Sequence, residues 1–395
     1  MTYRINGLLR AVAEPPIAEA HGWIQGRSFP AEKKLIDVAQ AVPGYPPPAS
    51  LTTHLAEIAP QPQIARYTEI EGIPRLREAL AGHMSQFYGA RIEAAQVAIT
   101  AGCNQGFCLA AMTLAAAGDE IILPLPYYFN HRMWLDMLGI NSVLLPFRPD
   151  RGGVPDPDEA ASLIGPKTRA IVLVSPNNPT GAVYPRETLA AFRDLAKARG
   201  IALVIDETYK DFLASDGPPH DLFAAKDWAD TLIQLYSFSK VYCLTGYRVG
   251  AVLASPGFIA EMAKAMDCVA ICAPRIGQEA ALYGLEHLGD WRVEKRRLMS
   301  ERVAALHQAF AGEDTGYEIV SAGAYFAYLR HPFAGTPARA VAKHLAEDEN
   351  MLCLPGSMFG PGQEDYLRFA FANVETALMP EIARRLAHSA RRNRF

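Results

Sequence analysis

The sequence predicts an α/β fold in which helices cover both faces of a mostly parallel, seven-stranded sheet, with a smaller α+β domain beside it. Between residues 96 and 254, short β-rich segments alternate with longer segments of helical pattern. Most of the short segments are apolar throughout, which is typical of strands buried on both faces of a parallel sheet. They are VAIT (97–100), EIILP (120–124), SVLLP (142–146), AIVLVS (170–175), ALVID (202–206), LIQLYS (232–237) and VGAVLA (249–254).

The chain has 395 residues, more than one hydrophobic core usually holds, so we expect two domains. Residues 46–275 are predicted to form the large domain, with helices near 50–59 and 74–88. Residues 1–45 and 276–395 are predicted to form the smaller one. Its C-terminal part has a charged helical pattern over 278–312, a helix over 337–348, and the strand-like segments AYFAYLR and YLRFAFAN.

Composition excludes several classes of protein. Half of the residues are apolar and a fifth are charged, as in ordinary globular proteins, which excludes disorder and coiled-coil rods. The net charge of −4 gives no electrostatic reason to expect a nucleic acid or an anionic membrane as partner. No stretch is apolar enough for a signal peptide or a membrane span, so we expect a cytoplasmic protein. The six cysteines lack CxxC spacing, and we expect buried thiols and no metal site.

Lys240, in the segment SFSK, directly follows the strand expected over 232–237. Ligands of α/β sheets bind outside the carboxyl ends of strands, and a lysine there is a candidate for a covalent bond to a carbonyl substrate or cofactor. Lysines also end strands routinely, so this segment alone is a weak signal. Asp206 ends the preceding strand, where it either caps the next helix or places an anion beside a pyridinium nitrogen. Tyr209 is then positioned to donate to the phenolic oxygen of such a cofactor.

Two further segments follow apolar strands. SPNNPTG (175–181) has the composition of a Pro/Asn turn. TAGCNQG (100–106) leads from a strand into a helix through a glycine, which leaves backbone N–H groups free for a phosphate. Neither segment is specific by itself.

Together, these four segments resemble those of the class I/II aminotransferases of the aspartate aminotransferase superfamily, which are fold-type I enzymes dependent on pyridoxal 5'-phosphate. The resemblance covers nearly the whole chain and includes ARYTEIEGIPRLREAL, SPNNPTG, DETY, SFSK with Arg248 eight residues after its lysine, and RFAFAN. It implies a homodimer that moves an amino group between an L-amino acid and a 2-oxo acid by ping-pong transamination.

The resemblance assigns roles in the chemistry to individual residues. It makes Lys240 the catalytic lysine that forms a Schiff base with the cofactor and then carries a proton between the substrate α-carbon and cofactor C4′. Asp206 becomes the partner of the ring nitrogen, and Tyr128 stacks on the ring. Asn178 and Tyr209 become donors to the phenolic oxygen, and Asn178 also contacts substrate.

The resemblance also assigns the anion-binding groups. Arg368 becomes the clamp for the α-carboxylate of the substrate. Tyr67 is implied to reach the cofactor phosphate of the neighbouring subunit. The phosphate in the same subunit is assigned to Gly102, Cys103, Asn104, Ser237 and Arg248, with Ser239 as a weaker candidate.

Several positions stay open at this stage. Many relatives have a glycine where this chain has Ala41, and the added methyl group either narrows the site or only alters the turn. Arg275 either binds a second substrate carboxylate or is a surface or hinge arginine. Tyr127, Asn130 and His131 form a polar cluster, in which we expect a structural rather than a catalytic histidine because Lys240 already supplies the base.

Three other functions compete with transamination. A β-lyase shares its first step, removal of the α-proton, so the two reactions diverge only later. A non-catalytic, effector-sensing domain of a transcriptional regulator is disfavoured because no basic helix-turn-helix segment precedes the domain. A nicotinamide dehydrogenase is excluded because no G-x-G-x-x-G segment follows a predicted strand.

Overall fold

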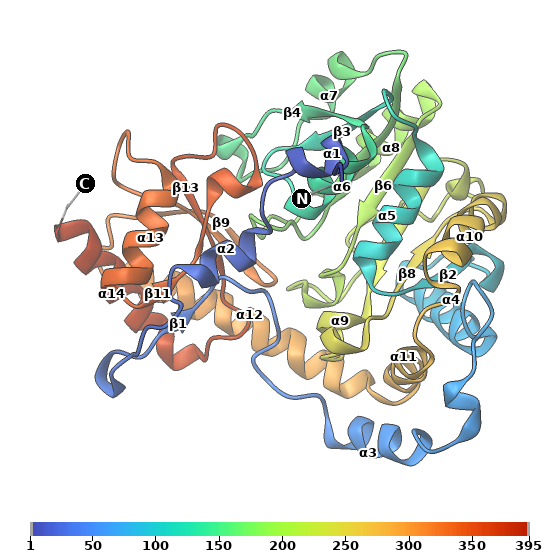
Figure 1. Ribbon diagram of the computed structural model, residues 1–395, viewed down its shortest axis with the longest axis horizontal. Helices are drawn as coiled ribbons and strands as arrows, with labels where there is room; N and C mark the ends of the chain where they lie inside the picture. Colours follow the sequence, from blue (N-terminus) through green and yellow to red (C-terminus); the bar gives the residue numbers. More distant parts are fainter. Residues whose placement is uncertain (1–2, 393–395) are drawn as a thin grey trace.

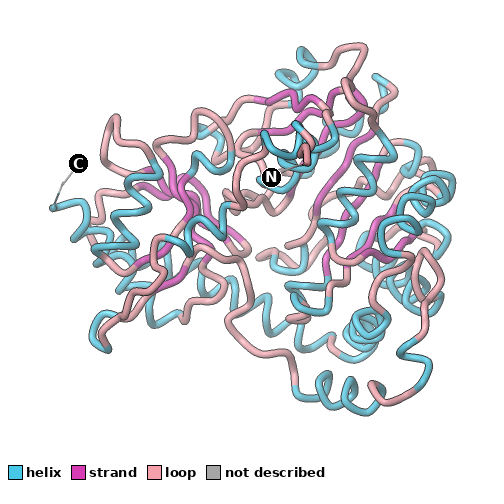
Figure 2. Tube along the Cα trace, in the orientation of Figure 1, coloured by secondary structure: helices cyan, strands magenta, loops and turns pink. Residues whose placement is uncertain are grey.

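The computed structural model describes residues 3–392 and is organised around a seven-stranded sheet (Figures 1 and 2). Strand β8 is antiparallel to both of its neighbours, and the other pairings are parallel. In spatial order the strands are β2 (Val97–Thr100), β8 (Gly250–Leu253), β7 (Leu232–Ser237), β6 (Ala202–Asp206), β5 (Thr168–Val174), β3 (Glu120–Pro124) and β4 (Asn141–Leu145). The predicted fold class is confirmed, and each predicted strand lies within two residues of its observed bounds.

The alternation of side chains along the strands supplies two apolar faces, each covered by helices. Ile121 and Val172 face one layer of helices, whereas Ile122 and Ile171 face the other. The first layer contains α5 (Cys103–Leu114), α6 (Phe129–Leu138) and α10 (Pro256–Ala270). The second contains α4 (Pro74–Tyr88), α8 (Arg186–Arg199) and α11 (Arg275–His287). The sheet is therefore buried on both faces, as its continuously apolar strands predict.

A second, antiparallel sheet forms the core of the smaller part of the molecule, at the left of Figure 1. Its strands, in spatial order, are β12 (Leu354–Pro355), β13 (Tyr366–Ala370), β10 (Phe326–Arg330) and β9 (Glu318–Gly323). The helices α12 (Gly289–Gly312), α13 (Ala338–Asp348) and α14 (Met379–Arg392) contribute to the same apolar core. Strand β1 (Ile36–Asp37) pairs in parallel with β11 (Met351–Leu352), so the N-terminal segment joins this part.

The remaining helices lie outside these layers or are short. They are α1 (Gly7–Ala11), α2 (Pro16–Gly22), α3 (Ala49–Ile58), α7 (Pro157–Leu163) and α9 (Phe238–Val241). Within residues 3–392, no helix combines the length and the apolar character needed to cross a membrane. The cytoplasmic location expected from the sequence stays a prediction.

The helical pattern over residues 278–312 belongs to two helices that separate near Leu288. Helix α11 packs against α3 and α4, and its Ala280 and Ala281 are buried in the core of the large sheet. In α12, Leu306 is buried in the core of the smaller part. The domain division at residues 45/46 and 275/276 stays a prediction, and the packing of α11 favours a boundary near Leu288.

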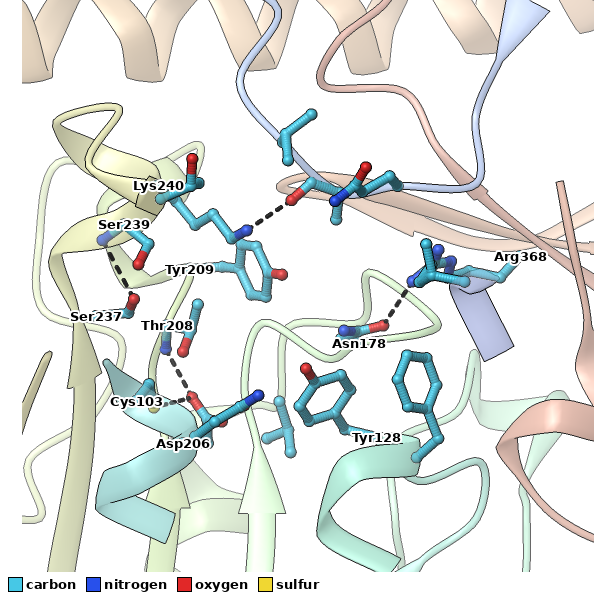
Figure 3. Close-up of a pocket in the computed structure, with 18 of the residues that line it drawn as sticks. Cys103, Tyr128, Asn178, Asp206, Thr208, Tyr209, Ser237, Ser239, Lys240 and Arg368 are labelled. Atoms are coloured by element: carbon cyan, nitrogen blue, oxygen red, sulfur yellow. Dashed lines mark hydrogen bonds between the residues drawn. The ribbon is translucent and has the colours of Figure 1, made fainter. Parts of the chain in front are cut away.

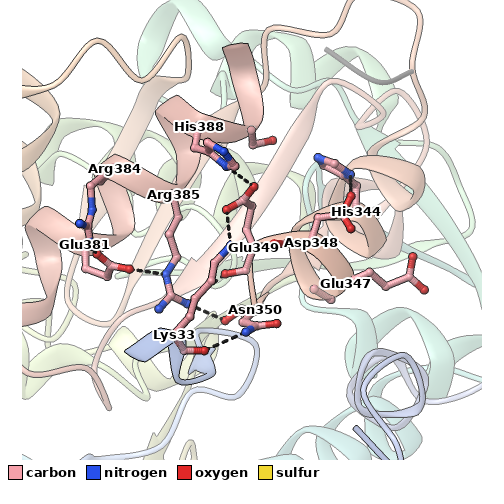
Figure 4. A network of polar contacts seen from close by, with 12 residues as sticks. Lys33, His344, Glu347, Asp348, Glu349, Asn350, Glu381, Arg384, Arg385 and His388 are labelled. Carbon is pink, nitrogen blue, oxygen red and sulfur yellow. Dashed lines mark hydrogen bonds and ion pairs between the residues drawn. The ribbon is translucent and has the colours of Figure 1, made fainter. Parts of the chain in front are cut away.

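The N-terminal segment is fixed to the smaller part by a buried polar network (Figure 4). The Arg385 guanidinium donates to the carbonyl oxygens of Lys34, Glu349 and Asn350 at 2.9, 3.0 and 2.9 Å. The buried Glu349 carboxylate accepts a hydrogen bond from Lys33 at 3.0 Å. These contacts hold the segment that continues through residues 39–42, which reach the carboxyl edge of the large sheet.

Gly181 ends the SPNNPTG turn where this turn meets the smaller sheet. Its φ of +74° lies in the left-handed region, and a Cβ atom there would overlap the backbone of Phe326 and Gly323. Both the backbone conformation and the close contact therefore require glycine. The turn can hold Asn178 against the smaller part because no side chain separates the two backbones.

We expect Gly181→Ala to destabilise the protein more than Gly200→Ala does. Gly200 also has a positive φ, +63°, but a Cβ atom there meets nothing within 4 Å. The control variant therefore loses only about 1 kcal/mol of its free energy of unfolding, because an alanine strains the backbone there. Gly181→Ala loses roughly 1–3 kcal/mol more of the free energy of unfolding, because its Cβ atom overlaps the backbone of the smaller sheet. Urea unfolding midpoints measure the difference, and equal midpoints would show that the turn is not packed as described.

Candidate active site

A cavity of about 360 Å³ opens at the carboxyl ends of β5, β6 and β7 (Figure 3). The strands contribute Val174, Asp206 and Ser237, and the smaller part contributes Arg368. The other residues that line the cavity are Ile17, Gln40, Ala41, Val42, Cys103, Asn104, Tyr128, Phe129, Asn178, Thr208, Tyr209, Ser239, Lys240, Thr245 and Arg248.

Most of the site residues predicted from the sequence line this one cavity. Gly102 lies at its edge, where an added Cβ atom would overlap the Arg248 guanidinium. Tyr67 does not line it, and its side chain is 73% exposed in the single chain. The structure thus brings together all of the predicted residues except Tyr67, while the role of each residue stays a prediction.

Lys240 lies in the short helix α9, directly after β7. Its Nζ donates to the carbonyl oxygen of Ala41 at 2.6 Å. Burial, and then the positive charges of Arg248 and Arg368, lower the pKa of Lys240 to about 8. A substantial fraction of this amine is therefore neutral near physiological pH, as a nucleophile or a general base requires.

Asp206 ends β6 as a buried carboxylate on the floor of the cavity. Its Oδ1 accepts a hydrogen bond from the backbone N–H of Thr208 at 2.9 Å, and His131 Nε2 lies 3.5 Å from its Oδ2. Burial would raise the pKa of Asp206, but the hydrogen bond and charge of His131 and the bonds from Thr208 outweigh it and lower the pKa. The site therefore holds a fixed negative charge.

His131 shows a contact that sequence analysis missed. The ring stacks on Phe107 with centroids 3.9 Å apart, and its Nε2 faces Asp206. Helix α6 carries the histidine and β6 carries the aspartate. The polar cluster around His131 was visible in the sequence, but nothing there indicated its partner because the two residues are far apart along the chain.

Arg368 is a buried cation on β13, with 2% of the residue exposed. Its guanidinium donates to Asn178 Oδ1 at 3.3 Å and to the carbonyl oxygen of Ala39, and lies between the rings of Phe326 and Phe359. Burial lowers its pKa to about 10, so the group stays charged at neutral pH. Among residues 3–392 it has no ion-pair partner within 4.0 Å. A buried charge with neutral partners favours an anionic ligand.

A second anion-binding arrangement lies at the start of α5, where the helix presents N–H groups without intrahelical partners. Arg248 reaches this end of the helix, and its Nη2 donates to the carbonyl oxygen of Ala101 at 3.4 Å. Gly250 allows β8 to pass close by, since a Cβ atom there would lie 2.6 Å from Cys103 N. Ser237 adds a hydroxyl group at the same side of the cavity. A helix start, a guanidinium and a hydroxyl suit a phosphate group.

Tyr128 and Tyr209 place two phenolic groups in the cavity. Asn130 Nδ2 donates to the Tyr128 hydroxyl at 2.9 Å. Burial raises the pKa of Tyr128 to about 12 and raises that of Tyr209 well above the ordinary value. Both groups are therefore protonated at neutral pH, and each has an O–H to donate to a ligand.

Beneath Asp206, on the other face of the sheet, Glu207 organises a buried network that no sequence pattern indicated. Its Oε2 accepts a hydrogen bond from the Tyr88 hydroxyl at 2.7 Å and another from Gln234. His220 Nε2 lies 3.1 Å from its Oε1. Burial would raise the pKa of Glu207, but the nearby charge of His220 and the hydrogen bonds from Tyr88 and Gln234 outweigh it and lower the pKa. This network anchors the end of β6 and so positions Asp206.

The structure describes two of the positions that the sequence left open. Arg275 does not line the cavity, and its Nε lies 3.5 Å from Glu279 Oε1. Ala41 does line the cavity, next to Lys240.

The expectation of buried thiols is correct for Cys103 and Cys353 but wrong for Cys268, which is exposed on the outward side of α10. Cys108, Cys243 and Cys272 are partly buried, and all six cysteines are free. In the described part of the chain, no group of three or more His, Cys, Asp and Glu side chains is arranged to hold a metal ion.

The cavity thus suits a ligand with a carbonyl group for Lys240 and with anionic groups for the two arginines. The model of the family "Aminotransferase class I and II" matches residues 33–386, so the chain belongs to this family. It is therefore an aminotransferase. Neither the family nor the named relatives favour the β-lyase alternative.

Known relatives have similar length and fold. The chain is 31% identical to the aromatic aminotransferase ISS1 of Arabidopsis thaliana, over 92% of this chain and 91% of that protein. It is 30% identical to an aspartate aminotransferase of Pyrococcus horikoshii, over 80% and 81%. The structure of Thermus thermophilus aspartate aminotransferase with maleate superposes with a TM-score of 0.89 at 24% identity, covering 98% of this chain and 100% of that one. This superposition shows the same fold.

The lowered pKa of Lys240 predicts selective labelling of this residue. In the protein without cofactor, acetylation of Lys240 by acetic anhydride should increase with a midpoint near pH 8. Mass spectrometry of the peptide containing Lys240 measures this midpoint. Arg368→Gln should raise the midpoint because it removes a positive charge that disfavours the protonated amine. Arg199→Gln, at an exposed position in the last turn of α8, is the control and should leave it unchanged. A midpoint near the ordinary lysine pKa of about 10.4 would contradict the prediction.

Proposed function

We propose that this aminotransferase binds pyridoxal 5'-phosphate in the cavity and moves an amino group from an L-amino acid to a 2-oxo acid, with Lys240 as its catalytic residue. The observation that carries this proposal is the buried lysine of lowered pKa beside a fixed carboxylate and two cationic sites. Family membership supports the same cofactor.

The residues present fit the proposed cofactor. The start of α5, Ser237 and Arg248 would hold its phosphate, and the Asp206 carboxylate would hold the protonated ring nitrogen. Tyr209 and Asn178 would donate to its phenolic oxygen, and Tyr128 would pack on the ring. When bound, the cofactor supplies a reactive carbonyl carbon and an electron-accepting ring.

Lys240 is the group that moves the proton. With a pKa of about 8, its amine would take up the proton of the substrate α-carbon and would be the group that delivers it to C4′ of the bound cofactor. Arg368 would hold the α-carboxylate by two parallel hydrogen bonds and thereby orient the Cα–H bond toward Lys240. Both substrates carry this carboxylate, so one clamp serves both halves of a ping-pong reaction.

We also propose that two chains form a homodimer in which Tyr67 reaches the phosphate of the partner's cofactor. The support is that Tyr67 is a large aromatic residue left 73% exposed by the single chain. A measured mass in solution of one chain only would contradict this arrangement.

Lys240→Ala should remove covalent attachment of the cofactor. In the unaltered protein, borohydride reduction should fix pyridoxal phosphate to the peptide that contains Lys240, as mass spectrometry can detect. In Lys240→Ala no peptide should carry that mass, and transamination should fall by about 10²-fold or more because the base is lost. Lys264→Ala, which alters an exposed lysine paired with Glu261, is the control. Attachment that persists in Lys240→Ala would overturn the proposal.

Arg368→Gln should lower kcat/KM for the amino acid and for the 2-oxo acid alike. Losing one partner of a buried, hydrogen-bonded charge pair costs roughly 2–5 kcal/mol, which corresponds to about 30-fold to several thousand-fold. Arg330→Gln changes an arginine on the same sheet that pairs with Glu318 outside the cavity, and it should leave both constants unchanged. Steady-state kinetics with both substrates measures these changes. A fall in kcat/KM with only one of the two substrates would contradict a shared carboxylate clamp.

A further inference from the structure

Under the proposed function, every charged group that lines the cavity already has a role with the cofactor or with the substrate α-carboxylate. Among the described residues, the cationic side chains that line it are Lys240, Arg248 and Arg368. Lys240 attaches the cofactor, Arg248 lies at the phosphate position, and Arg368 meets the α-carboxylate. The one lining carboxylate, Asp206, serves the ring nitrogen. Within the described chain no lining cation remains for a second carboxylate on the substrate.

Part of the cavity wall is apolar. Ile17 of helix α2, Val42 of the N-terminal segment and Phe129 of helix α6 all line the cavity. The Phe129 ring lies 5.5 Å from that of Phe359, and Phe359 lies 5.3 Å from the Arg368 guanidinium. A substrate held by Arg368 therefore has the rings of Phe129 and Phe359 near its side chain, and Ile17 and Val42 line the same cavity.

The layer behind this wall is apolar as well. Phe129 and Phe359 belong to a buried cluster with Leu352, Leu354 and Met358, against which Ile17 packs. Burying a substrate carboxylate against such a wall without a partner would be strongly unfavourable, whereas burying an apolar side chain is favourable.

We propose that the substrate side chain is uncharged and apolar, of the aromatic or large aliphatic class, and that Ile17, Val42 and Phe129 select it. This inference rests on the proposed function, because it takes Arg368 as the α-carboxylate clamp. An apolar pocket favours aromatic or aliphatic substrates over acidic ones. The names of the relatives do not decide between these substrates, since they include both aspartate and aromatic aminotransferases.

The competing assignment gives a second carboxylate to Arg275. In the single chain this arginine lies away from the cavity and next to Glu279. Arg275 could supply the missing charge only from a partner subunit. The variant Arg275→Ala therefore belongs in the test.

The first experiment compares amino donors in single turnovers of the holoenzyme. Phenylalanine, leucine, methionine, aspartate, glutamate and alanine are each mixed with it, and loss of the cofactor's visible band is followed. We expect phenylalanine, leucine or methionine to react at least about tenfold faster than aspartate and glutamate. A faster reaction with aspartate or glutamate would overturn this inference and leave transamination intact. No reaction with any donor would overturn the proposed function itself.

The second experiment measures binding without reaction. Isothermal titration calorimetry of the holoenzyme uses 3-phenylpropanoate and succinate, which lack an amino group and differ in having a phenyl group or a second carboxylate. We expect 3-phenylpropanoate to bind at least about tenfold more tightly. Tighter binding of succinate would overturn the inference. So would a selective loss of succinate binding in Arg275→Ala, because it would show that this arginine recognises a second carboxylate.

Matched variants test the wall directly. Ile17→Ala should lower kcat/KM for phenylalanine about tenfold more than kcat/KM for alanine, because only the larger side chain reaches the wall. Leu9→Ala makes the same change at a 51% exposed position of helix α1 and should alter neither constant. Equal losses with both substrates in Ile17→Ala would show a structural rather than a selective role and would contradict the assignment.

Discussion

The burial of the Arg368 guanidinium is the interaction on which the arrangement of the site depends. The residue is 2% exposed and its hydrogen-bond partners are neutral, the carbonyl oxygen of Ala39 and the amide of Asn178. These three residues come from the smaller sheet, the N-terminal segment and a turn at the edge of the large sheet. One charged side chain thus joins three distant parts of the chain. Its charge is balanced only when an anion enters the cavity.

The positive groups of the cavity also act on each other. Arg248 and Arg368 lower the pKa of Lys240, after the larger effect of burial. When anions neutralise these arginines, their repulsion of a protonated lysine weakens, and Lys240 becomes a stronger base. The groups that recognise the ligand therefore also adjust the proton affinity of the lysine that acts on it. Recognition and basicity are therefore coupled through charge.

Sequence patterns were sufficient where the determinants are local. The seven strands of the large sheet follow from continuous apolar segments, and the positions of Lys240, Asp206 and Ser237 follow from the ends of those strands. The partners of these residues depend on contacts between distant segments, which no local pattern encodes. His131 beside Asp206, Glu207 with Tyr88, and the carbonyl of Ala41 at Lys240 are of this kind. The strands β1, β11 and β12 were missed because two residues carry too little periodicity to be recognised, and the six-residue strand β9, which is only partly buried, was missed as well.

The network around Arg385 has a consequence for the order in which the protein assembles during translation. The ribosome synthesises the N-terminal segment before the later elements of the chain. This segment is nevertheless held by Arg385 of helix α14, which donates to the carbonyl oxygen of Lys34. Strand β8 likewise enters the sheet between β2 and β7, both of which precede it in sequence. The N-terminal segment that lines the cavity is synthesised early, yet its contact with Arg385 cannot form until helix α14 has emerged.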